Sequence, residues 1–357
     1  MRKRLRLLWL TWLLSILLIS CSSALVEEAR DAEVHEELTK PSRVSVWNVY
    51  WDHDNMEKEM EVLKDHIDEI CYFAAYFDSD NSLFIPQEVT NNFDRVKKGF
   101  NNGEGYTHYL SIVNDKINLD GTSTLKDTEL LYSLFLDENK LESHINEIIT
   151  MALEGGYDGI EIDYERMKAD KKLWELFIDY CEQLHEGLKD KNLKMRVVLE
   201  PSFLGDDLDF PLGPDYIMMC YNLYGLGTKP GPKADQAFII ELVEKMQPLP
   251  GEKGFAFATG GFDWAENGEV TAVTEQEAIE RMDAYGATPT RDEKSQCLYY
   301  EYVDADQLGH ELWFADGETL SFWVETVKEM GDYNIALWRL NGNGGESLQE
   351  FISDIIS

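Results

Sequence analysis

The stretch YDGIEIDYE, residues Tyr157–Glu165, decides the fold prediction because its side chains alternate in character. Successive side chains of a β-strand point to opposite faces of the sheet. One face would carry apolar and aromatic side chains, namely Ile160, Ile162 and Tyr164. The other face would carry acids, namely Glu161, Asp163 and Glu165. The stretch is therefore predicted to be a strand with one face in a core and three carboxylates on the other face.

Apolar segments of strand length recur along the chain, and segments of helical periodicity separate most of them. Together with the first stretch they number eight: 44–51, 70–77, 106–114, 157–165, 194–201, 215–222, 254–262 and 334–341. Alternating strands and helices predict a parallel sheet that is covered by helices. Eight such units predict a closed (β/α)8 TIM barrel. A doubly wound open sheet is the structural alternative.

About seventy residues separate the seventh predicted strand from the eighth. Within them, CLYYEYVDADQLGHELWF (Cys297–Phe314) is typical of short aromatic strands joined by turns. We expect a small β-rich insertion at this position, packed beside the mouth of the barrel.

The three acids of the first stretch would point toward the barrel axis, because their apolar neighbours would face the helices. Glu165 would lie nearest the mouth, where the active sites of this fold are found. Three close carboxylates in a partly dry interior cannot all ionise easily, so at least one should keep a raised pKa. A raised pKa is the property of a general acid. The alternative is a structural cluster held by Arg or Lys, with Arg166 adjacent.

Composition and charge describe a globular and strongly acidic protein. The chain has 357 residues, 44% of them hydrophobic, and a formal net charge of −36. Nucleic acids and anionic lipid head groups are excluded as partners because the acidic protein would repel them. No Cys-x-x-Cys spacing is present, so neither a zinc site nor a disulfide framework is predicted.

The N-terminus predicts export. Residues 1–20 combine basic residues with an apolar run that is too short for a comfortable membrane span. The sequence LISC at 18–21 resembles the lipobox of bacterial lipoproteins, which implies a lipidated Cys21 and a cell-membrane location on the extracytoplasmic face. Ordinary secretory cleavage is the alternative. Residues 21–42 are expected to form an acidic tether, and residues 43–357 the globular domain, anchored to the membrane by lipid only.

Three motifs carry a resemblance to a known family. DGIEIDYE, Asp158–Glu165, resembles the Asp-Gly-x-Asp-x-Asp-x-Glu signature of glycoside hydrolase family 18, the chitinases and endo-β-N-acetylglucosaminidases. MCYN, Met219–Asn222, is similar to that family's Met-x-Tyr-Asp on the sixth strand. ALWRL, Ala336–Leu340, falls where the family has a tryptophan at the floor of its sugar pocket. The fold of this family is a (β/α)8 barrel.

The resemblance implies a retaining, substrate-assisted reaction, with Glu165, Asp163 and Tyr221 as catalytic residues. Glu165 would protonate the glycosidic oxygen, and the sugar's own 2-acetamido carbonyl would attack the anomeric carbon. Asp163 would stabilise the acetamido nitrogen of the resulting oxazolinium, and Tyr221 would bond to the acetamido oxygen. The substrate would further contact five residues: Glu161, Asn222, Trp338, Met219 and Ser111. The resemblance implies no metal and no organic cofactor.

Three positions depart from the family pattern. Glu161 stands where the family most often has Asp, and Asn222 replaces an Asp. The family's Ser-x-Gly-Gly on the third strand is represented only by Ser111–Asn114. These departures concern the substrate and the rate more than the type of reaction.

The sequence therefore predicts an exported, lipid-tethered, monomeric glycosidase that acts on β-1,4-linked N-acetylglucosamine glycans. Chitin oligosaccharides, the core of N-glycans and peptidoglycan are the candidates, and the negative charge favours neutral glycans. The alternative function is a non-catalytic, chitinase-like sugar-binding lipoprotein. A solute-binding lipoprotein is disfavoured because it should show two open lobes in place of eight evenly spaced units.

Overall fold

The computed structural model describes residues 42–51, 56–100, 104–205 and 208–356. The predicted signal peptide, Cys21 and all but the last residue of the tether lie outside these ranges. The compact unit that contains the elements described below spans Arg43–Ser357. Nowhere in the described ranges is a helix both long and apolar enough to cross a membrane.

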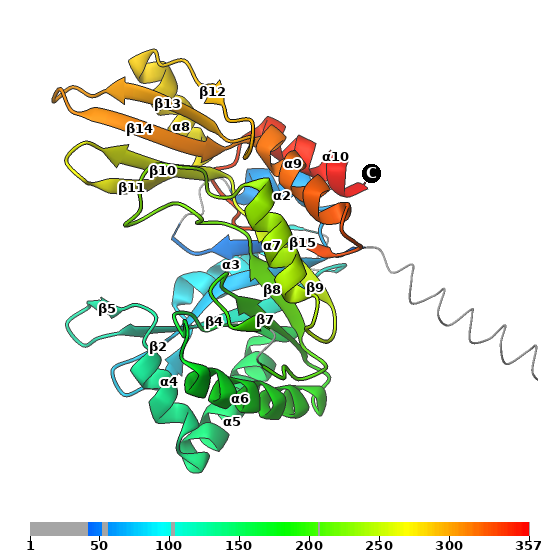
Figure 1. Cartoon of the computed structure of the whole chain (residues 1–357). Coiled ribbons are helices and arrows are strands. Elements are labelled where there is room, and N and C mark those ends of the chain that lie inside the picture. The colour runs from blue at the N-terminus through cyan, green and yellow to red at the C-terminus, as the bar shows by residue number, and fades with distance from the viewer. Residues whose placement is uncertain (1–41, 52–55, 101–103, 206–207, 357) are drawn as a thin grey trace, which may run out of the picture. The chain divides into compact units, whose positions relative to one another are not determined.

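Eight strands of the described residues form a closed parallel barrel (Figure 1), which confirms the predicted (β/α)8 fold. They are β1 (Val44–Val49), β2 (Glu69–Phe77), β4 (Thr107–Ile117), β6 (Gly159–Asp163), β7 (Lys194–Leu199), β8 (Asp215–Met219), β9 (Lys253–Phe257) and β15 (Asn334–Leu337). Each strand pairs with the next along the chain, and β15 pairs with β1 to close the barrel. Two short antiparallel strands, β3 (Leu83–Phe84) and β5 (Ser123–Thr124), extend β2 and β4.

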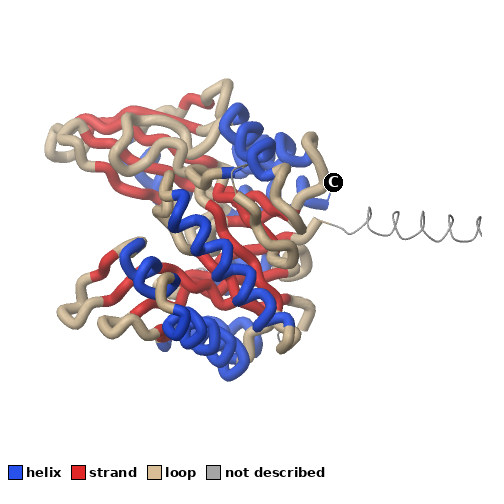
Figure 2. The backbone as a smooth tube through the Cα atoms, turned by 60° about the horizontal axis from the view of Figure 1, so that its bottom comes forward, coloured by secondary structure: helices blue, strands red, loops and turns tan. Residues whose placement is uncertain are grey.

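Helices follow most barrel strands and cover them from outside (Figure 2). They are α2 (Met56–Leu63), α3 (Gln87–Gly99), α4 (Thr128–Phe135), α5 (Glu138–Gly155), α6 (Lys171–Lys189), α7 (Gln236–Met246), α9 (Gly317–Lys328) and α10 (Gly345–Ile356). Five of them begin after an Asp whose side chain accepts a backbone N–H of the first turn: Asp127, Asp137, Asp170, Asp235 and Asp316. Part of the acidic composition is therefore used to cap helices.

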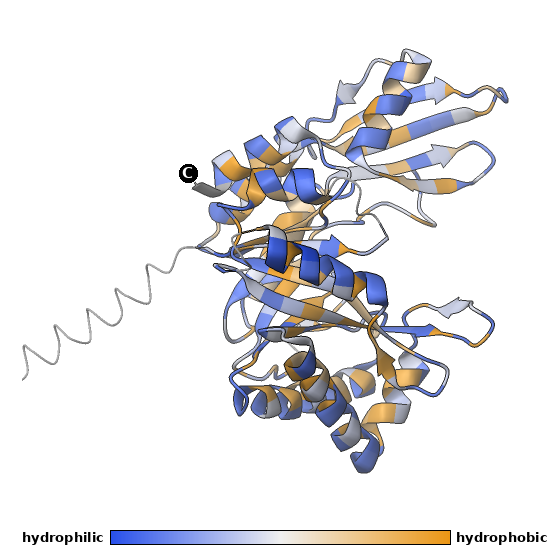
Figure 3. Cartoon of the chain, turned by 180° about the vertical axis from the view of Figure 1, so that it is seen from behind, coloured by the Kyte–Doolittle hydropathy of each residue, from blue (hydrophilic) through white to orange (hydrophobic). Residues whose placement is uncertain are grey.

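The alternation of the opening stretch has the predicted consequence. Ile160, Ile162 and Tyr164 belong to the large apolar core between the strands and the helices. The Tyr164 hydroxyl, for example, lies 2.9 Å from Nε2 of His144 on α5. In Figure 3 the barrel strands carry long hydrophobic stretches, whereas the helices alternate between hydrophobic and hydrophilic positions. The acidic side of β6 is therefore left facing the barrel interior.

The predicted insertion is present between β9 and β15. It contains β10 (Gly260–Ala265), β11 (Val270–Val273), α8 (Glu275–Tyr285), β12 (Thr290–Arg291), β13 (Leu298–Val303) and β14 (Gly309–Ala315). Its strands form an antiparallel sheet in the order β11-β10-β14-β13-β12. Helix α8 packs on this sheet around a small core: Val273, Ala278, Tyr300, Leu312 and Phe314.

The structure corrects several predicted strand boundaries: β6 ends at Asp163 and not at Glu165, and β8 ends at Met219 and not at Asn222. The segment 254–262 was expected to be one strand, but β9 ends at Phe257 and β10 begins at Gly260. Gly260 has a φ of +64°, and a Cβ there would lie 2.4 Å from the backbone oxygen of Val273. The chain turns at this glycine and leaves the barrel for the insertion. The last predicted strand ends at Leu337 and not at Asn341, whose φ of +80° is incompatible with a strand.

Candidate active site

Glu161 lies inside the barrel, below the mouth, and is fully buried. Its Oε1 accepts hydrogen bonds from Trp47 Nε1 at 2.7 Å and from Ser111 Oγ at 2.5 Å. Its Oε2 is 2.8 Å from Nε of Arg196, a residue of β7 that is also fully buried. Glu161 and Ser111, both predicted to contact the substrate, hydrogen-bond to each other inside the barrel, and Glu161 also bonds to Trp47 and Arg196.

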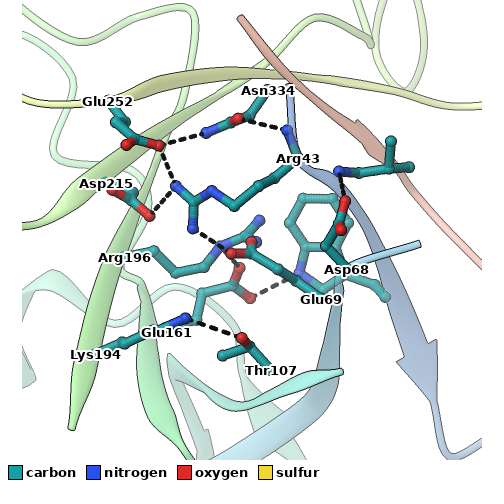
Figure 4. A network of polar contacts seen from close by, with 12 residues as sticks. Arg43, Asp68, Glu69, Thr107, Glu161, Lys194, Arg196, Asp215, Glu252 and Asn334 are labelled. Atoms are coloured by element: carbon teal, nitrogen blue, oxygen red, sulfur yellow. Dashed lines mark hydrogen bonds and ion pairs between the residues drawn. The ribbon is translucent and has the colours of Figure 1, made fainter. Parts of the chain in front are cut away.

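The Arg196 guanidinium continues this network toward the N-terminal ends of the strands (Figure 4). Its Nη1 lies 2.9 Å from Oε2 of Glu69 on β2. Arg43, just before β1, contacts Glu69 from the other side and also pairs with Asp215 at 2.7 Å and Glu252 at 2.5 Å. The interior acids of the lower barrel are therefore neutralised by two arginines that come from other parts of the chain.

Asp163 is the last residue of β6 and only 5% exposed. Burial raises the pKa of its carboxyl well above the ordinary range, and the nearby Glu165 charge raises it further, while Lys126 acts in the opposite direction. Among the described residues its Oδ1 has no hydrogen-bond partner. Asp163 is thus the acid of the group whose pKa burial raises, and its Oδ1 is left without a partner among the described residues.

Glu165 follows β6 and is partly exposed at the barrel mouth. Asn114 of β4 holds its backbone on both sides: Asn114 Oδ1 accepts from Glu165 N at 3.0 Å, and Asn114 Nδ2 donates to Glu165 O at 3.1 Å. The Glu165 carboxylate contacts the ammonium of Lys126, which lies between β5 and α4. The cation beside this acid is therefore Lys126, whereas the neighbouring Arg166 is exposed and donates to the backbone of Leu125 at 3.4 Å.

Met219 and Tyr221 come from the end of β8 and belong to the apolar cluster inside the barrel. Tyr221 is 8% exposed. Burial raises the pKa of its hydroxyl well above the ordinary value, and the charges of Asp163 and Glu165 raise it further. The hydroxyl is accordingly a neutral hydrogen-bond donor beside the two acids. Asn222, the next residue, is exposed with a φ of +63°, so it is less enclosed than the other predicted site residues.

Trp338 directly follows β15 and packs edge-on against two interior rings. Its ring centroid is 5.7 Å from that of Trp47 and 5.0 Å from that of Phe73. A cavity of about 330 Å³ lies beside it, between the barrel and the insertion. Its lining includes Lys233, Thr259, Gly261, Thr274, Trp338 and Arg339. Trp338 therefore borders this cavity, and Asp163, Glu165 and Tyr221 are not among the described residues that line it.

The structure brings Asp163, Glu165 and Tyr221 into one electrostatic group at the carboxyl ends of β6 and β8. Sequence reasoning did not identify three charged neighbours: Lys126, Arg196 and Glu200. Of these three, only Glu200 could have been identified from the sequence, because it is an acid at the carboxyl end of a predicted strand. Within the described ranges, no group of three or more His, Cys, Asp or Glu side chains could hold a metal ion.

The fold is a closed barrel, and the site places a pair of carboxylates at its mouth. The solved structures with this fold include chitinases. A chitinase from Chromobacterium violaceum matches with a TM-score of 0.73 and 14% identity, over 88% of this chain and 99% of that one. The GH18 chitinase ChiB of Flavobacterium johnsoniae matches with a TM-score of 0.66 and 16% identity, over 89% and 94%. The spore cortex-lytic enzyme SleL of Bacillus megaterium matches with a TM-score of 0.72 and 19% identity, over 88% and 74%. The chain thus has the fold of family 18 chitinases, as the sequence resemblance predicted.

Two proteins of similar sequence are also named as a glycosylase and as a lytic enzyme. The chain is 26% identical over 229 residues to YdhD, a proposed sporulation-specific glycosylase of Bacillus subtilis (strain 168). It is 23% identical over 238 residues to the cortical fragment-lytic enzyme of the same organism. These matches cover 60% and 59% of this chain, and only about half of the relatives, 54% and 53%. No model of a known protein family matches the chain.

Proposed function

We propose that the chain hydrolyses β-1,4-linked N-acetylglucosamine glycans by a retaining, substrate-assisted reaction. The observation that carries the proposal is the group formed by Asp163, Glu165 and Tyr221 at the barrel mouth. The chitinase fold and the relatives named as glycosylase and fragment-lytic enzyme support it. A purely sugar-binding protein would have no need of a buried, protonatable Asp163 beside Glu165.

In the proposed reaction Glu165 donates a proton to the glycosidic oxygen while the bond to the anomeric carbon breaks. The carbonyl oxygen of the sugar's 2-acetamido group forms a new bond to that carbon and gives an oxazolinium ion. Asp163 accepts the acetamido N–H, for which its unpartnered Oδ1 is suited. The Tyr221 hydroxyl donates to the acetamido oxygen, and Trp338 stacks against the sugar ring. Water then loses a proton to Glu165 and opens the oxazolinium, which restores the acid.

Chitin oligosaccharides, the N-glycan core and peptidoglycan remain the proposed substrates. The solved chitinases and the cortex-lytic relatives make chitin fragments and spore-cortex fragments the first pair to compare. We further propose that the domain is a monomer held on the extracytoplasmic side of a cell membrane by lipid on Cys21. The basic and apolar residues before Cys21 support this location.

The test is hydrolysis of fluorogenic N-acetylglucosamine and chitobiose glycosides, and of cortex fragments, by residues 43–357 and by Glu165→Gln. The variant keeps the shape of the side chain but cannot donate the proton, so we expect turnover to fall by at least about a hundredfold. Sugar binding, measured by calorimetry, should persist in the variant. Equal turnover in both proteins, or sugar binding without turnover in either on all these substrates, would refute the proposed reaction. The second outcome would favour the sugar-binding alternative.

A further inference from the structure

The cavity beside Trp338 has a polar lining to which the proposed reaction gives no role. It is lined by the loop between β8 and α7, by strands β10 and β11 of the insertion, and by residues 338–341 after β15. Its volume of about 330 Å³ lies at the lower end of the range for small-ligand sites. Trp338 also packs against the apolar cluster that contains Tyr221, so the cavity and the interior of the barrel share this ring.

Lys233 brings a cation to this cavity without an acid to neutralise it. Its Nζ donates to the backbone oxygen of Thr259 at 2.8 Å and lies 5.7 Å from the ring centroid of Phe262. No carboxylate of the described residues pairs with it, although the chain holds 68 Asp and Glu residues against 32 Lys and Arg. Arg196 and Lys126, by contrast, each contact a carboxylate. The ammonium of Lys233 therefore keeps hydrogen-bond donors for an anion.

The charges around the cavity favour an anion as its ligand. Burial lowers the pKa of the Lys233 ammonium to about 8, against an ordinary value of 10.5, so this cation is poorly solvated. Arg339 brings a second cation to the lining. Glu277 is the acid among the described lining residues, and its Oε2 already accepts from Thr274 N at 2.7 Å and from Thr274 Oγ1 at 3.1 Å. The lining is therefore positive in a strongly acidic chain.

Asn341 adds a buried amide to the same cavity. It is 4% exposed, and neither its Nδ2 nor its Oδ1 has a hydrogen-bond partner among the described residues. Its backbone N–H donates to Oε2 of the buried Glu59 at 2.7 Å, which fixes the position of the residue. Buried polar groups are seldom left unpaired, because an unmade hydrogen bond costs free energy. The amide therefore offers one donor and one acceptor to a bound molecule.

We infer that this cavity binds the carboxylate of an acidic glycan. The carboxylate oxygens accept from Lys233 Nζ and Asn341 Nδ2, and a hydroxyl or amide N–H of the same molecule donates to Asn341 Oδ1. The inference rests on the proposed function, because it takes the ligand to be the glycan that stacks against Trp338. Of the three proposed substrates, peptidoglycan is the one that bears carboxyl groups, whereas chitin and the N-glycan core are neutral. The local positive charge therefore selects an acidic substrate that the net charge of the chain disfavours.

The experiment compares two ligands that differ only in charge. They are the disaccharide N-acetylglucosaminyl-β-1,4-N-acetylmuramic acid and the same disaccharide with its carboxyl group converted to the amide. Calorimetry measures their affinities for the full chain carrying Glu165→Gln, in which the glycan stays intact. We expect the acid to bind at least about tenfold more tightly than the amide, because charge-assisted hydrogen bonds are the stronger ones. Adding Lys233→Met should abolish this preference.

Lys245→Met is the matched control. The Lys245 ammonium also donates to a backbone oxygen, that of Pro201 at 2.7 Å, and also lies over an aromatic ring, that of Phe203. Lys245 is not among the described residues that line the cavity, so this variant should keep the preference for the acid. Asn341→Gly removes the unpartnered amide at a φ of +80°, which glycine adopts readily, and should weaken the binding of both disaccharides.

Turnover by the wild type separates this inference from the proposed hydrolysis. A preference for the acid that depends on Lys233, in a protein that cleaves no glycan, would refute the hydrolysis and keep the binding site. Cleavage of the fluorogenic glycosides without a preference for the acid would overturn the binding site and keep the hydrolysis. A preference that survives Lys233→Met, or binding of neither disaccharide, would also overturn the binding site. The comparison of acid with amide in a single protein gives its answer even if a variant fails to fold.

Discussion

At the scale of single residues, Arg196 supplies the counter-charge for the buried Glu161 inside the barrel. Arg196 is fully buried, and its guanidinium faces the carboxylates of Glu161 and Glu69. Arg196→Met would leave the buried Glu161 without its counter-charge, while Glu69 would keep its contact with Arg43, so we expect a loss of about 3–5 kcal/mol in the free energy of unfolding. Urea denaturation checks this value.

The matched control for that prediction is Lys98→Met, which breaks an exposed ion pair to Asp94 on α3. Exposed pairs contribute at most about 1 kcal/mol, so this variant should unfold close to the wild type. If Arg196→Met proved no more destabilising than Lys98→Met, the interior network would contribute nothing specific to the fold.

The same residues show how much of the site could be predicted from the sequence. The inward direction of Glu161 and Asp163 was predictable because alternation along a strand is a local property, whereas Glu165 lies beyond the end of β6. The cations that neutralise them were not, because Arg196 and Lys126 come from other segments and meet the acids only after the barrel closes. Asn114 was noted only as a departure from a glycine-rich pattern, yet its amide holds the Glu165 backbone.

At the scale of elements, β10 shows why the seventh strand was predicted too long. Gly261 lies where β10 pairs with β14, and a Cβ at this position would be 1.7 Å from the backbone oxygen of Trp313. The backbone of β14 cannot move away without breaking the pairing that joins the two halves of the insertion sheet. The sequence shows an apolar run through this glycine. It does not show that a strand about fifty residues later in the chain packs against it.

The close approach gives a prediction for Gly261→Ala. We expect the variant to lose about 2 kcal/mol or more of stability, because the clash is with backbone and not with a movable side chain. Thermal unfolding measures the effect. Gly99→Ala is the control, since a Cβ at the end of α3 meets nothing within 4 Å and should change the Tm little. Equal Tm values for the two variants would contradict the close approach of β10 and β14.

At the scale of the whole molecule, one buried acid joins the insertion to the C-terminal helix. Glu275, in the first turn of α8, is 2% exposed. Its Oε2 accepts from Gly344 N at 2.8 Å, and its Oε1 accepts from Ser347 Oγ on α10 at 2.5 Å. The net charge of −36 reflects mostly solvated acids and helix caps, but this carboxyl is enclosed between two parts of the fold.

Burial raises the pKa of Glu275 to about 7, against an ordinary value of 4.5. Between these values the folded state holds the proton more tightly than the unfolded state, so this group's contribution to stability is full below about pH 4.5 and is lost as pH rises through 7. The loss should be on the order of 3 kcal/mol, since a difference of one in pKa corresponds to about 1.4 kcal/mol. Urea unfolding at pH 5, 6, 7 and 8 should therefore show Glu275→Gln gaining on the wild type as pH rises. Ser347→Ala keeps the carboxyl and should retain the wild-type fall, whereas parallel curves for the wild type and Glu275→Gln would show that Glu275 stays ionised in the folded protein throughout.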